Sequence, residues 1–588
     1  MTKNRTLLVT LAALAVFTAS IVYRAVFCTD LSGAVCYEIE AAHRMLQGQI
    51  PFRDFYFDLP LTLPLLRMPT VWLAQLLTTG SHLSAAVLSF KAMAIASFIE
   101  VSLIAVLSFA LCIHIVVASK RDDNSQRLLW FALLGFAFGN FAMGYSYGCA
   151  QHIFALLLSP YLFLRLSAWL QTGLVKTSDA EIVDTESGAD SKIGSVWLRI
   201  FCGLLAGFAA SFDPLFIFVP ITIEALEFLS RRLDGKANTF ADEFFWLLMF
   251  SLLSWSYLLV LDKVAMAELV DWIIPLKYTS YYLEQMAYFG LGATPDRRDV
   301  IYLCTIAAII AFGIVNRLSF LRPIIALMMA GFVLYQMGMS GLSSDILLAI
   351  WATCMAFSVE ICYLFDSSFF VNLSRRYPKL SYRRANKARA VGLIALCAVA
   401  VISLAALEVI QRHDNLTVWY GPMAIDPTYL ELADSFPKYC CSGDSIMIIN
   451  GRLLPNFPLY SMTEKPIAGY FISTEPFSSL ANIEAHNLAD HMVGKPFGWI
   501  VATKKKIFDR LRSDIDKEKP GVIAVEGGQT FEGLEKSGII GRILVDYTGH
   551  GEARYHSRCV GAKEFADWNY RYNIYERKKA DENEANTK

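Results

Sequence analysis

The sequence predicts an α-helical, polytopic membrane protein with a small extracytoplasmic α/β domain at its C-terminal end. Of its 588 residues, 55% are hydrophobic and only 18% are charged, a composition typical of proteins that lie mostly within a bilayer. Apolar runs long enough to cross the hydrocarbon core recur up to about residue 410, and we expect about eleven transmembrane helices. The formal net charge of −1 gives no indication of nucleic-acid binding.

The expected transmembrane helices follow the apolar runs in order. They are residues 6–27, 84–118, 128–146, 151–170, 196–213, 214–230, 241–261, 299–316, 322–340, 345–365 and 389–410. The stretch 61–79 is also apolar, but Pro64, Arg67 and Pro69 interrupt it. Because proline removes a backbone donor, we interpret this stretch as a re-entrant or interfacial segment.

The distribution of Lys and Arg predicts the orientation in the membrane. The loop at 375–389 contains seven basic residues and no acidic residue, which is typical of a cytoplasmic loop. With the N-terminus also cytoplasmic, the first loop, the 262–298 loop and the tail after residue 411 face the opposite side.

Four parts are therefore expected along the chain. They are a first transmembrane helix (1–27), a first extracytoplasmic loop (28–83), a helical bundle (84–410) and an α/β domain (411–588). In the tail, β-branched runs bounded by Gly or Asp predict strands at 444–451, 498–502, 521–528 and 541–547. Apolar residues at helical spacing predict helices at 478–492 and 504–517.

Five cysteines fall in the extracytoplasmic segments, where the environment is oxidising. Cys28 could pair with Cys36, and either Cys440 or Cys441 could pair with Cys559. The sequence alone does not fix this connectivity.

The first loop begins with a predicted amphipathic helix. Its apolar face is Val35, Ile39, Ala42, Met45 and Leu46, and its polar face is Glu38, Glu40, His43 and Arg44. Ser32 can cap its first turn and Gly48 can end it. We expect the helix to lie along the membrane surface, with its N-terminus beside Asp30, where free N–H groups favour an anion such as phosphate. The alternative is an interfacial helix that only anchors the loop.

The order of residues after the first apolar run resembles that of integral-membrane glycosyltransferases of the GT-C fold. The resemblance is closest to the bacterial branch related to the protein mannosyltransferases and the aminoarabinose transferase. It is carried by Asp30, Tyr37, Ala41, Leu46, Gly48, Pro51, Phe52, Arg53, Asp54, Asp58, Pro60 and Pro64. The multi-span body and the extracytoplasmic tail are also similar to that family.

The resemblance implies transfer of a sugar from a polyprenyl-phosphate carrier to a lipid, glycan or protein acceptor. The reaction would take place on the outer side of a membrane, most simply the bacterial inner membrane. Asp30 is the candidate catalytic base, because the acceptor must lose a proton as it attacks the anomeric carbon. Asp58 and Asp54 are further candidates, with turn-capping as their alternative role. Asp30 is followed by Leu31, whereas relatives carry an Asp-Glu pair, so the role of a divalent metal stays open.

Cationic and aromatic residues are candidates for contacts with the substrates, because the leaving group is a lipid phosphate. Arg53 and Arg44 are candidates for the phosphate, and Tyr37 is included through the resemblance. Lys277 lies among tyrosines in the 262–298 loop and could contact phosphate and sugar together. His152, at the outer end of an apolar run, could contact the donor or serve a structural role.

Two other functions compete with the transferase. A lipid or glycan transporter, or flippase, usually has ionisable residues inside its spans. Here Lys91 and Glu100 are the main charged residues that we expect inside the spans, which favours chemistry in the outer loops. A sensor or scaffold acting through the tail is the third hypothesis.

Overall fold

A computed structural model shows the fold of the chain. It describes residues 2–27, 31–79, 88–119, 123–141, 147–174, 196–233, 242–279, 307, 309, 322–336, 347–365, 433–439, 444–450, 453–473, 475–486, 489–556 and 569–578. This part is mostly helical, with one small sheet.

The chain divides into two compact units. Unit 1 comprises Met1–Val26, Val101–Trp255 and Pro295–Gln411, and unit 2 comprises Phe27–Glu100, Ser256–Thr294 and Arg412–Lys588. Unit 2 therefore combines the first loop, part of the 262–298 loop and the tail.

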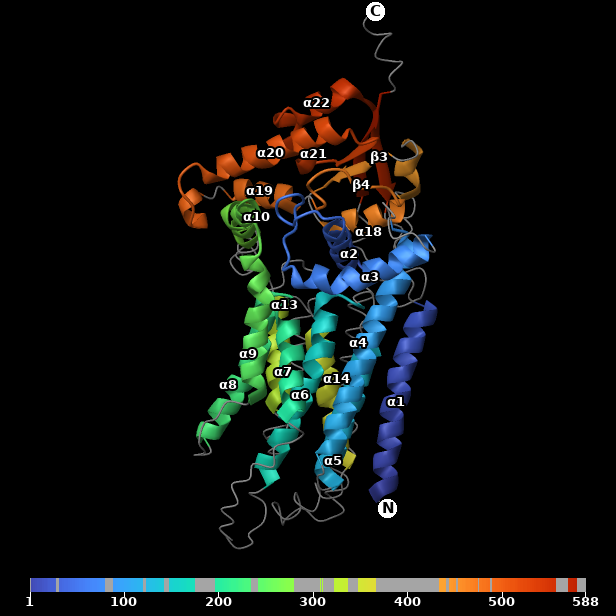
Figure 1. The fold of residues 1–588 in the computed structure, drawn as a ribbon, viewed down its shortest axis with the longest axis vertical. Helices are drawn as coiled ribbons and strands as arrows, with labels where there is room; N and C mark the ends of the chain where they lie inside the picture. Colours follow the sequence, from blue (N-terminus) through green and yellow to red (C-terminus); the bar gives the residue numbers. More distant parts are fainter. Residues whose placement is uncertain are drawn as a thin grey trace, which may run out of the picture. The chain divides into compact units, whose positions relative to one another are not determined.

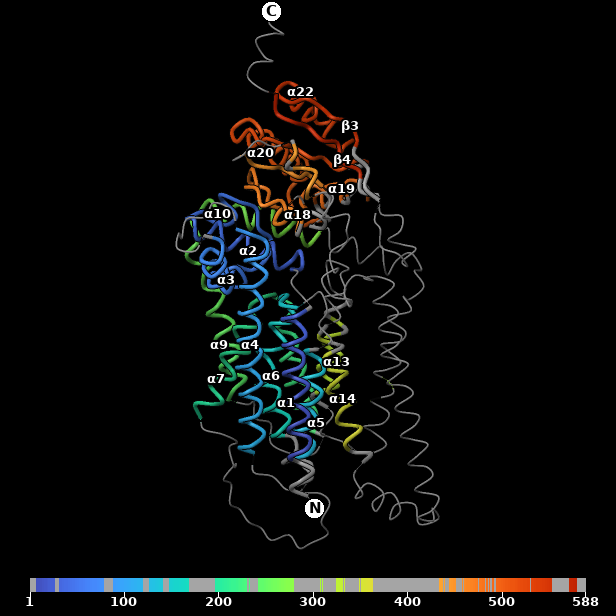
Figure 2. Tube along the Cα trace, turned by 90° about the vertical axis from the view of Figure 1, so that its right-hand side faces the viewer, coloured from blue at the N-terminus to red at the C-terminus, as the bar shows by residue number. Residues whose placement is uncertain are grey.

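Unit 1 is a helical bundle. Its helices are α1 (Thr2–Phe27), most of α4 (Phe90–Ala118), α5 (Asp123–Phe141), α6 (Ala150–Leu174), α7 (Val196–Ala210), α8 (Phe218–Leu233), α9 (Asp242–Ser254), α13 (Arg322–Gln336) and α14 (Leu347–Phe365). Helices α5, α6, α13 and α14 run alongside one another (Figure 2). The α5–α14 contact depends on small residues, since a Cβ on Gly135 would lie 2.5 Å from the Met355 Cα.

Two of the described helices are long and apolar enough to cross a membrane, Leu7–Val26 within α1 and Phe90–Ala118. A third qualifies if Asp242–Leu259 and Lys263–Thr279, which meet at 111°, form one broken span. The structure thus supports membrane association, while the total of about eleven spans stays a prediction. The predicted span 389–410 and nearly all of 299–316 lie outside the described residues.

Unit 2 is built around one hydrophobic core that the first loop and the tail share. Helices α2 (Gly33–Leu46), α3 (Thr62–Thr79) and α10 (Lys263–Glu268) contribute to it together with the π-helical turn η4 (Leu269–Ile273). Figure 1 shows α18 (Leu453–Thr463) of the tail beside α2, and the two helices are in contact. The first loop is therefore a packed part of the unit.

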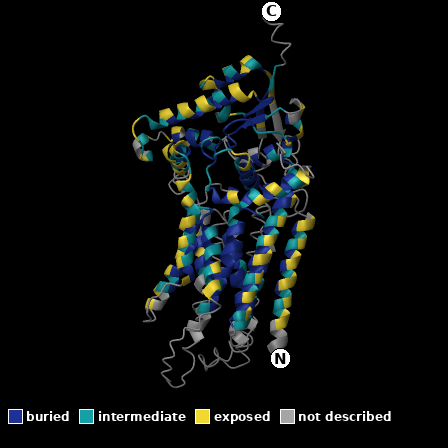
Figure 3. Ribbon diagram, viewed as in Figure 1, coloured by how far each residue is buried: buried dark blue, intermediate teal, exposed yellow. Residues whose placement is uncertain are grey.

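The tail contains a four-stranded mixed sheet in the order β1-β2-β4-β3. Strands β1 (Ile446–Ile449) and β2 (Val522–Glu526) are parallel, with Ile446 opposite Val522. Strand β4 (Asn569–Arg577) is antiparallel to both β2 and β3 (Tyr547–His556). Strands β1 and β2 are buried apart from Glu526, whereas Thr548–Glu552 of β3 are exposed and exposed residues recur along the surface of α20 (Trp499–Glu518) (Figure 3). The remaining tail helices are α19 (Glu475–Ala485), α21 (Gln529–Lys536) and α22 (Ile539–Asp546).

The structure confirms two of the predicted tail strands and corrects the other two. The segments 444–451 and 521–528 contain β1 and β2, but 498–502 begins α20 and 541–547 lies mostly in α22. In α20 the buried residues Thr503, Ile507, Leu511 and Ile515 recur every fourth position. The helical period of this longer pattern outweighs the short β-branched run at its start.

The predicted Cys28–Cys36 disulfide is wrong, because Cys36 is a buried free thiol on α2. Burial raises its pKa to about 12, so the reactive thiolate is disfavoured. Cys440, Cys441 and Cys559 lie outside the described residues.

Candidate functional site

Helix α2 forms where the sequence predicts it. The Ser32 side chain accepts a hydrogen bond from the Val35 backbone N–H at 3.3 Å, which caps the first turn. The helix ends at Leu46, and Gly48 follows with a φ of +86°, a backbone conformation that favours glycine. Both predicted helix ends are therefore confirmed.

The polar face of α2 is buried within the protein as well as its apolar face, which the amphipathic pattern does not predict; the expected position of the helix along a membrane surface stays a prediction. Glu38, His43 and Arg44 are at most 7% exposed. Arg67 of α3, itself fully buried, donates to Glu38 at 2.8 Å and to Glu100 at 2.9 Å. Buried charges are tolerated when they are paired, and α3 and α4 supply the partners that the sequence reading did not assign to this face.

The main cluster of predicted site residues surrounds the carboxylate of Asp58. The Tyr37 hydroxyl donates to Asp58 Oδ1 at 2.9 Å, and Lys277 Nζ donates to Asp58 Oδ2 at 2.9 Å. Lys277 also donates to the Asp58 backbone carbonyl at 2.9 Å. The side chain of Asp58 is 4% exposed and that of Lys277 is 15% exposed. Three residues that were predicted separately therefore meet: two come from the first loop, and Lys277 comes from a loop 219 positions after Asp58.

Aromatic rings surround Tyr37, the residue that donates to Asp58. The Tyr37 ring lies 5.0 Å from Phe57 and 5.6 Å from Phe457 of the tail. Burial, followed by the charge of Asp58, raises the pKa of the Tyr37 hydroxyl well above its usual value. Tyr37 therefore remains a hydrogen-bond donor, and the ammonium group of Lys277 supplies the positive charge that balances the carboxylate.

Arg53 and Asp54 belong to a second, more exposed cluster. Arg53 contacts both carboxylate oxygens of Asp54 at 3.0 Å and Asp262 Oδ2 at 2.6 Å. Asp54 also accepts from the Ile50 N–H, and the hydrogen bonds from Arg53 lower the pKa of the Asp54 carboxyl. Asp54 thus acts as a turn cap, and Arg53 joins the first loop to the Asp262 that caps α10.

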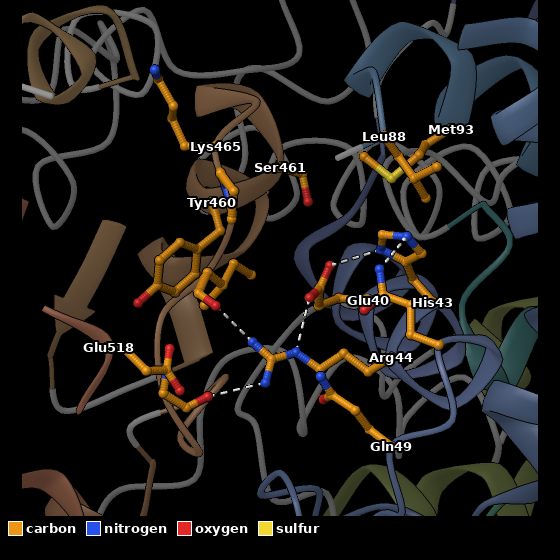
Figure 4. Close-up of a pocket in the computed structure, with 14 residues that line it drawn as sticks. Glu40, His43, Arg44, Gln49, Leu88, Met93, Tyr460, Ser461, Lys465 and Glu518 are labelled. Atoms are coloured by element: carbon orange, nitrogen blue, oxygen red, sulfur yellow. Dashed lines mark hydrogen bonds and ion pairs between the residues drawn. The ribbon is translucent and has the colours of Figure 1, made fainter. Parts of the chain in front are cut away.

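Arg44 connects α2 to the tail. Its guanidinium donates to Glu40 Oε1, the Gly469 carbonyl and the Ile467 carbonyl, each at 3.0 Å. In these contacts, the N–H groups of the Arg44 guanidinium donate to acceptors within the protein (Figure 4).

His152 lies in unit 1, where it forms a polar network between helices. Its Nδ1 accepts from the Gly148 N–H at 2.9 Å, so its Nε2 carries the proton that it shares with Asn140 Oδ1 at 2.9 Å. Asn140 donates in turn to Ser20 of α1 at 2.8 Å. This placement matches the structural alternative that the sequence left open.

Asp30, the first candidate base, lies outside the described residues. Within the described ranges, no group of three or more His, Cys, Asp or Glu side chains is arranged to hold a metal ion. A divalent metal bound through Asp30 therefore stays a prediction.

Three charged residues near the site were missed by the sequence reading, namely Glu38, Arg67 and Asp262 as ion-pair partners. The sequence did contain a signal for one of these pairs. Arg67 and Glu100 lie in neighbouring apolar segments, and charged residues in such segments usually pair. Arg165 was missed in the same way. It pairs with Glu224, Glu227 and Glu243 inside unit 1, so the expectation that the spans are nearly free of charge is wrong for α6, α8 and α9.

Two comparisons with known proteins found no relative of this chain. No protein-family model matches the sequence, and no curated protein matches it.

Proposed function

We propose that the protein is a membrane glycosyltransferase that moves a sugar from a polyprenyl-phosphate carrier to a lipid, glycan or protein acceptor. The observation that carries the proposal is the meeting of Asp58, Lys277 and Tyr37 in unit 2. A nearly buried carboxylate beside an ammonium group provides a proton acceptor and a partner for phosphate in one place. The order of residues from Asp30 to Pro64 supports the same function by resemblance.

In the proposed reaction, the acceptor oxygen forms a bond to the anomeric carbon of the donor sugar. The bond between that carbon and the phosphate oxygen breaks, and the polyprenyl phosphate leaves with the electron pair. A carboxylate takes the acceptor proton, and Lys277 would stabilise the charge that develops on the leaving phosphate. Asp30 and Asp58 are the two candidates for the base.

The proposed orientation puts unit 2 on the outer side of the membrane and the N-terminus in the cytoplasm. The cluster of seven basic residues at 375–389 supports this orientation. The bacterial inner membrane is the proposed location, through the resemblance alone.

The class of reaction is tested with the purified protein in liposomes that contain labelled polyprenyl-phosphate sugars and a crude acceptor extract. We expect labelled sugar to leave the carrier and free polyprenyl phosphate to accumulate at the same rate. Asp30→Asn and Asp58→Asn, with expression matched to wild type, identify the base as the variant with the larger loss of turnover. Intact donor after prolonged incubation with every sugar and extract would count against the transferase.

The ion-pair network of Arg165 is the observation that favours the alternative, a lipid or glycan transporter. Its three glutamates lie on α8 and α9, and all three pair with the same guanidinium. Because the three carboxylates all contact Arg165, we interpret the network as a cross-link between helices. Movement of labelled lipid between leaflets, without release of the sugar, would favour the transporter.

A further inference from the structure

Unit 2 exposes apolar side chains where the tail contacts the helix Lys263–Thr279. Phe497 is fully exposed, and Val501, near the start of α20, is 73% exposed. On the neighbouring helix, Val270 and Ile274 are also exposed. These four side chains form the apolar patch. Large apolar side chains gain free energy when they leave water, and an apolar patch on a protein surface marks a site of interaction.

Hydrogen bonds join the two halves of the apolar patch. The Trp499 indole N–H donates to the Asp271 carbonyl at 2.8 Å, and Lys495 Nζ donates to the Val270 carbonyl at 3.3 Å. Each of these donors and acceptors belongs to a patch residue or lies close to one in the sequence. Two distant segments of the chain therefore form one surface.

The turn that carries Phe497 is held by Asp490. The carboxylate of Asp490 accepts from the Gly498 N–H and, at 2.7 Å, from the Ile500 N–H. The Lys495 N–H donates to the Asp490 carbonyl at 3.0 Å. Gly498 has a φ of +83°, a backbone conformation that favours glycine. Phe497 is therefore exposed by a turn that has its own hydrogen bonds.

The helix Lys263–Thr279 indicates that lipid covers the apolar patch. Its opposite face, which includes Trp272, lies in the core of unit 2. Just before its start, Leu259 and Val260 are 87% and 85% exposed, and Leu259 ends the apolar helix Asp242–Leu259. The two helices meet at 111°. A helix that bends this sharply after crossing a bilayer runs close to the membrane surface, with its exposed apolar face toward the hydrocarbon.

The residues at the edge of the apolar patch suit the headgroup region of a bilayer. Lys505 is exposed and lies one turn after Val501 on the same face of α20. A lysine side chain can reach lipid phosphates while its stem lies along apolar surface. Tyr278, one turn after Ile274, is exposed, and tyrosine is enriched at membrane–water interfaces.

We infer that the apolar patch inserts into the lipid leaflet beside unit 2 and anchors the tail to the membrane through Phe497 and Val501. The helix that carries the other half of the patch also carries Lys277 to Asp58. The lipid contact would hold this cluster at the membrane surface, where a lipid-linked substrate lies. The inference does not depend on sugar transfer, because a transporter of the same fold would make the same contact.

Photolabelling of the wild-type, full-length protein tests the lipid contact without any substitution. The protein is reconstituted in phosphatidylcholine liposomes that contain a lipid with a diazirine on its acyl chain. We expect adducts in residues 494–503 and in the apolar helix α1, and none on Leu544 or Val545, which are exposed on α22 of the same unit. Adducts in α1 without adducts in 494–503, or equal labelling of 494–503 and α22, would overturn the inference.

A depth measurement separates the bilayer from a second copy of the chain as the occupant. Spin labels are placed by Phe497→Cys, Val501→Cys or Val545→Cys in a protein without native cysteines, with Val545→Cys as the matched control. We expect the labels at 497 and 501 to lie about 5–10 Å below the lipid phosphates, and the label at 545 to collide freely with a water-soluble nickel complex.

Equal access of the nickel complex to the labels at 497 and 545 would contradict insertion. Dipolar coupling between the 497 labels of two copies, together with protection that disappears as the protein is diluted in lipid, would show an interface between copies and would also overturn the inference. Insertion without any sugar transfer would reject the proposed function and leave the lipid contact standing.

Discussion

Asp58 is held by a lysine from a distant segment, and the strength of this ion pair can be measured. Lys277→Met removes the cation from beside a carboxylate that is 4% exposed. Breaking a buried pair in this way costs about 3–5 kcal/mol. We expect Asp58→Asn/Lys277→Met to be more stable than the sum of the single variants predicts, by about 1–3 kcal/mol.

Thermal unfolding in detergent, followed by tryptophan fluorescence, gives all four corners of this double-mutant cycle. Asp509→Asn and Lys505→Met, both exposed on α20, serve as controls and should change stability little. Strictly additive effects of Asp58→Asn and Lys277→Met would show that the two side chains are not coupled.

A second carboxylate, Asp514 of α20, predicts how the stability of unit 2 depends on pH. Burial raises the pKa of Asp514 to about 6, against an ordinary value of 3.8. The folded state therefore holds the proton more tightly than the unfolded state, so this contribution to stability is complete below about pH 4. It is lost as the pH rises through about 6, by an amount on the order of 2–3 kcal/mol.

Asp514→Asn removes this titration. Its side-chain oxygen can still accept the hydrogen bond that Asp514 receives from the Tyr470 N–H at 2.8 Å. We expect the unfolding temperature of Asp514→Asn, relative to wild type, to rise between pH 4 and pH 7. A difference between the two proteins that stays constant with pH would show that Asp514 titrates normally.

The sequence predicted which residues belong to the candidate site better than it predicted which of them contact one another. Asp58, Tyr37 and Lys277 were each selected, but nothing in the spacing of Tyr37 and Lys277 shows that both contact one carboxylate. Arg53 was expected at a phosphate, whereas the structure pairs it with Asp54 and Asp262. Such partners depend on how the segments of unit 2 pack together, which local pattern does not encode.

Substitution of alanine for glycine should have opposite effects on stability at two positions in the tail. Gly469 has a φ of +90°, and a Cβ there would lie 3.1 Å from both Asp514 Oδ2 and Met447 Cε. Gly469→Ala should destabilise the protein by about 1–3 kcal/mol, because the strained backbone and the contacts add. Gly541 lies in α22, where an added Cβ would meet open space, so Gly541→Ala should stabilise by about 0.5–1 kcal/mol.

Chemical unfolding of the two alanine variants in detergent measures both changes. Gly494→Ala is the control for backbone strain alone, because Gly494 has a φ of +71° and a Cβ added to it would have no described neighbour within 4 Å. Equal effects of Gly469→Ala and Gly494→Ala would show that the contact with Asp514 contributes nothing.

The elements of the tail show where sequence patterns suffice. Predictions based on a long helical period hold for α20, as do those for the buried runs of β1 and β2. Strands β3 and β4 were missed, although Tyr572 and Ile574 of β4 are buried at alternating positions. Many of their residues are charged or polar, so strand pairing rather than hydrophobicity defines them.

The shared core of unit 2 constrains the topology of the whole chain. Because α2 and the tail pack into one core, we expect the first loop and the tail to lie on the same side of the membrane. Cysteines introduced at Leu46 and Lys505, in a protein without native cysteines, should both react with a membrane-impermeant maleimide added to intact cells. Reaction at one position and protection at the other until lysis would contradict a unit that contains both segments.

The central claim is that the Asp58 cluster of this membrane protein transfers a sugar from a polyprenyl-phosphate donor. The most direct measurement is the rate of transfer by membranes that contain wild type, Asp58→Asn or Asp509→Asn at matched expression. We predict that Asp58→Asn is slower by about a hundredfold or more, because the cluster loses its carboxylate, while Asp509→Asn keeps the wild-type rate. A folded Asp58→Asn protein that transfers sugar at nearly the wild-type rate would contradict the claim.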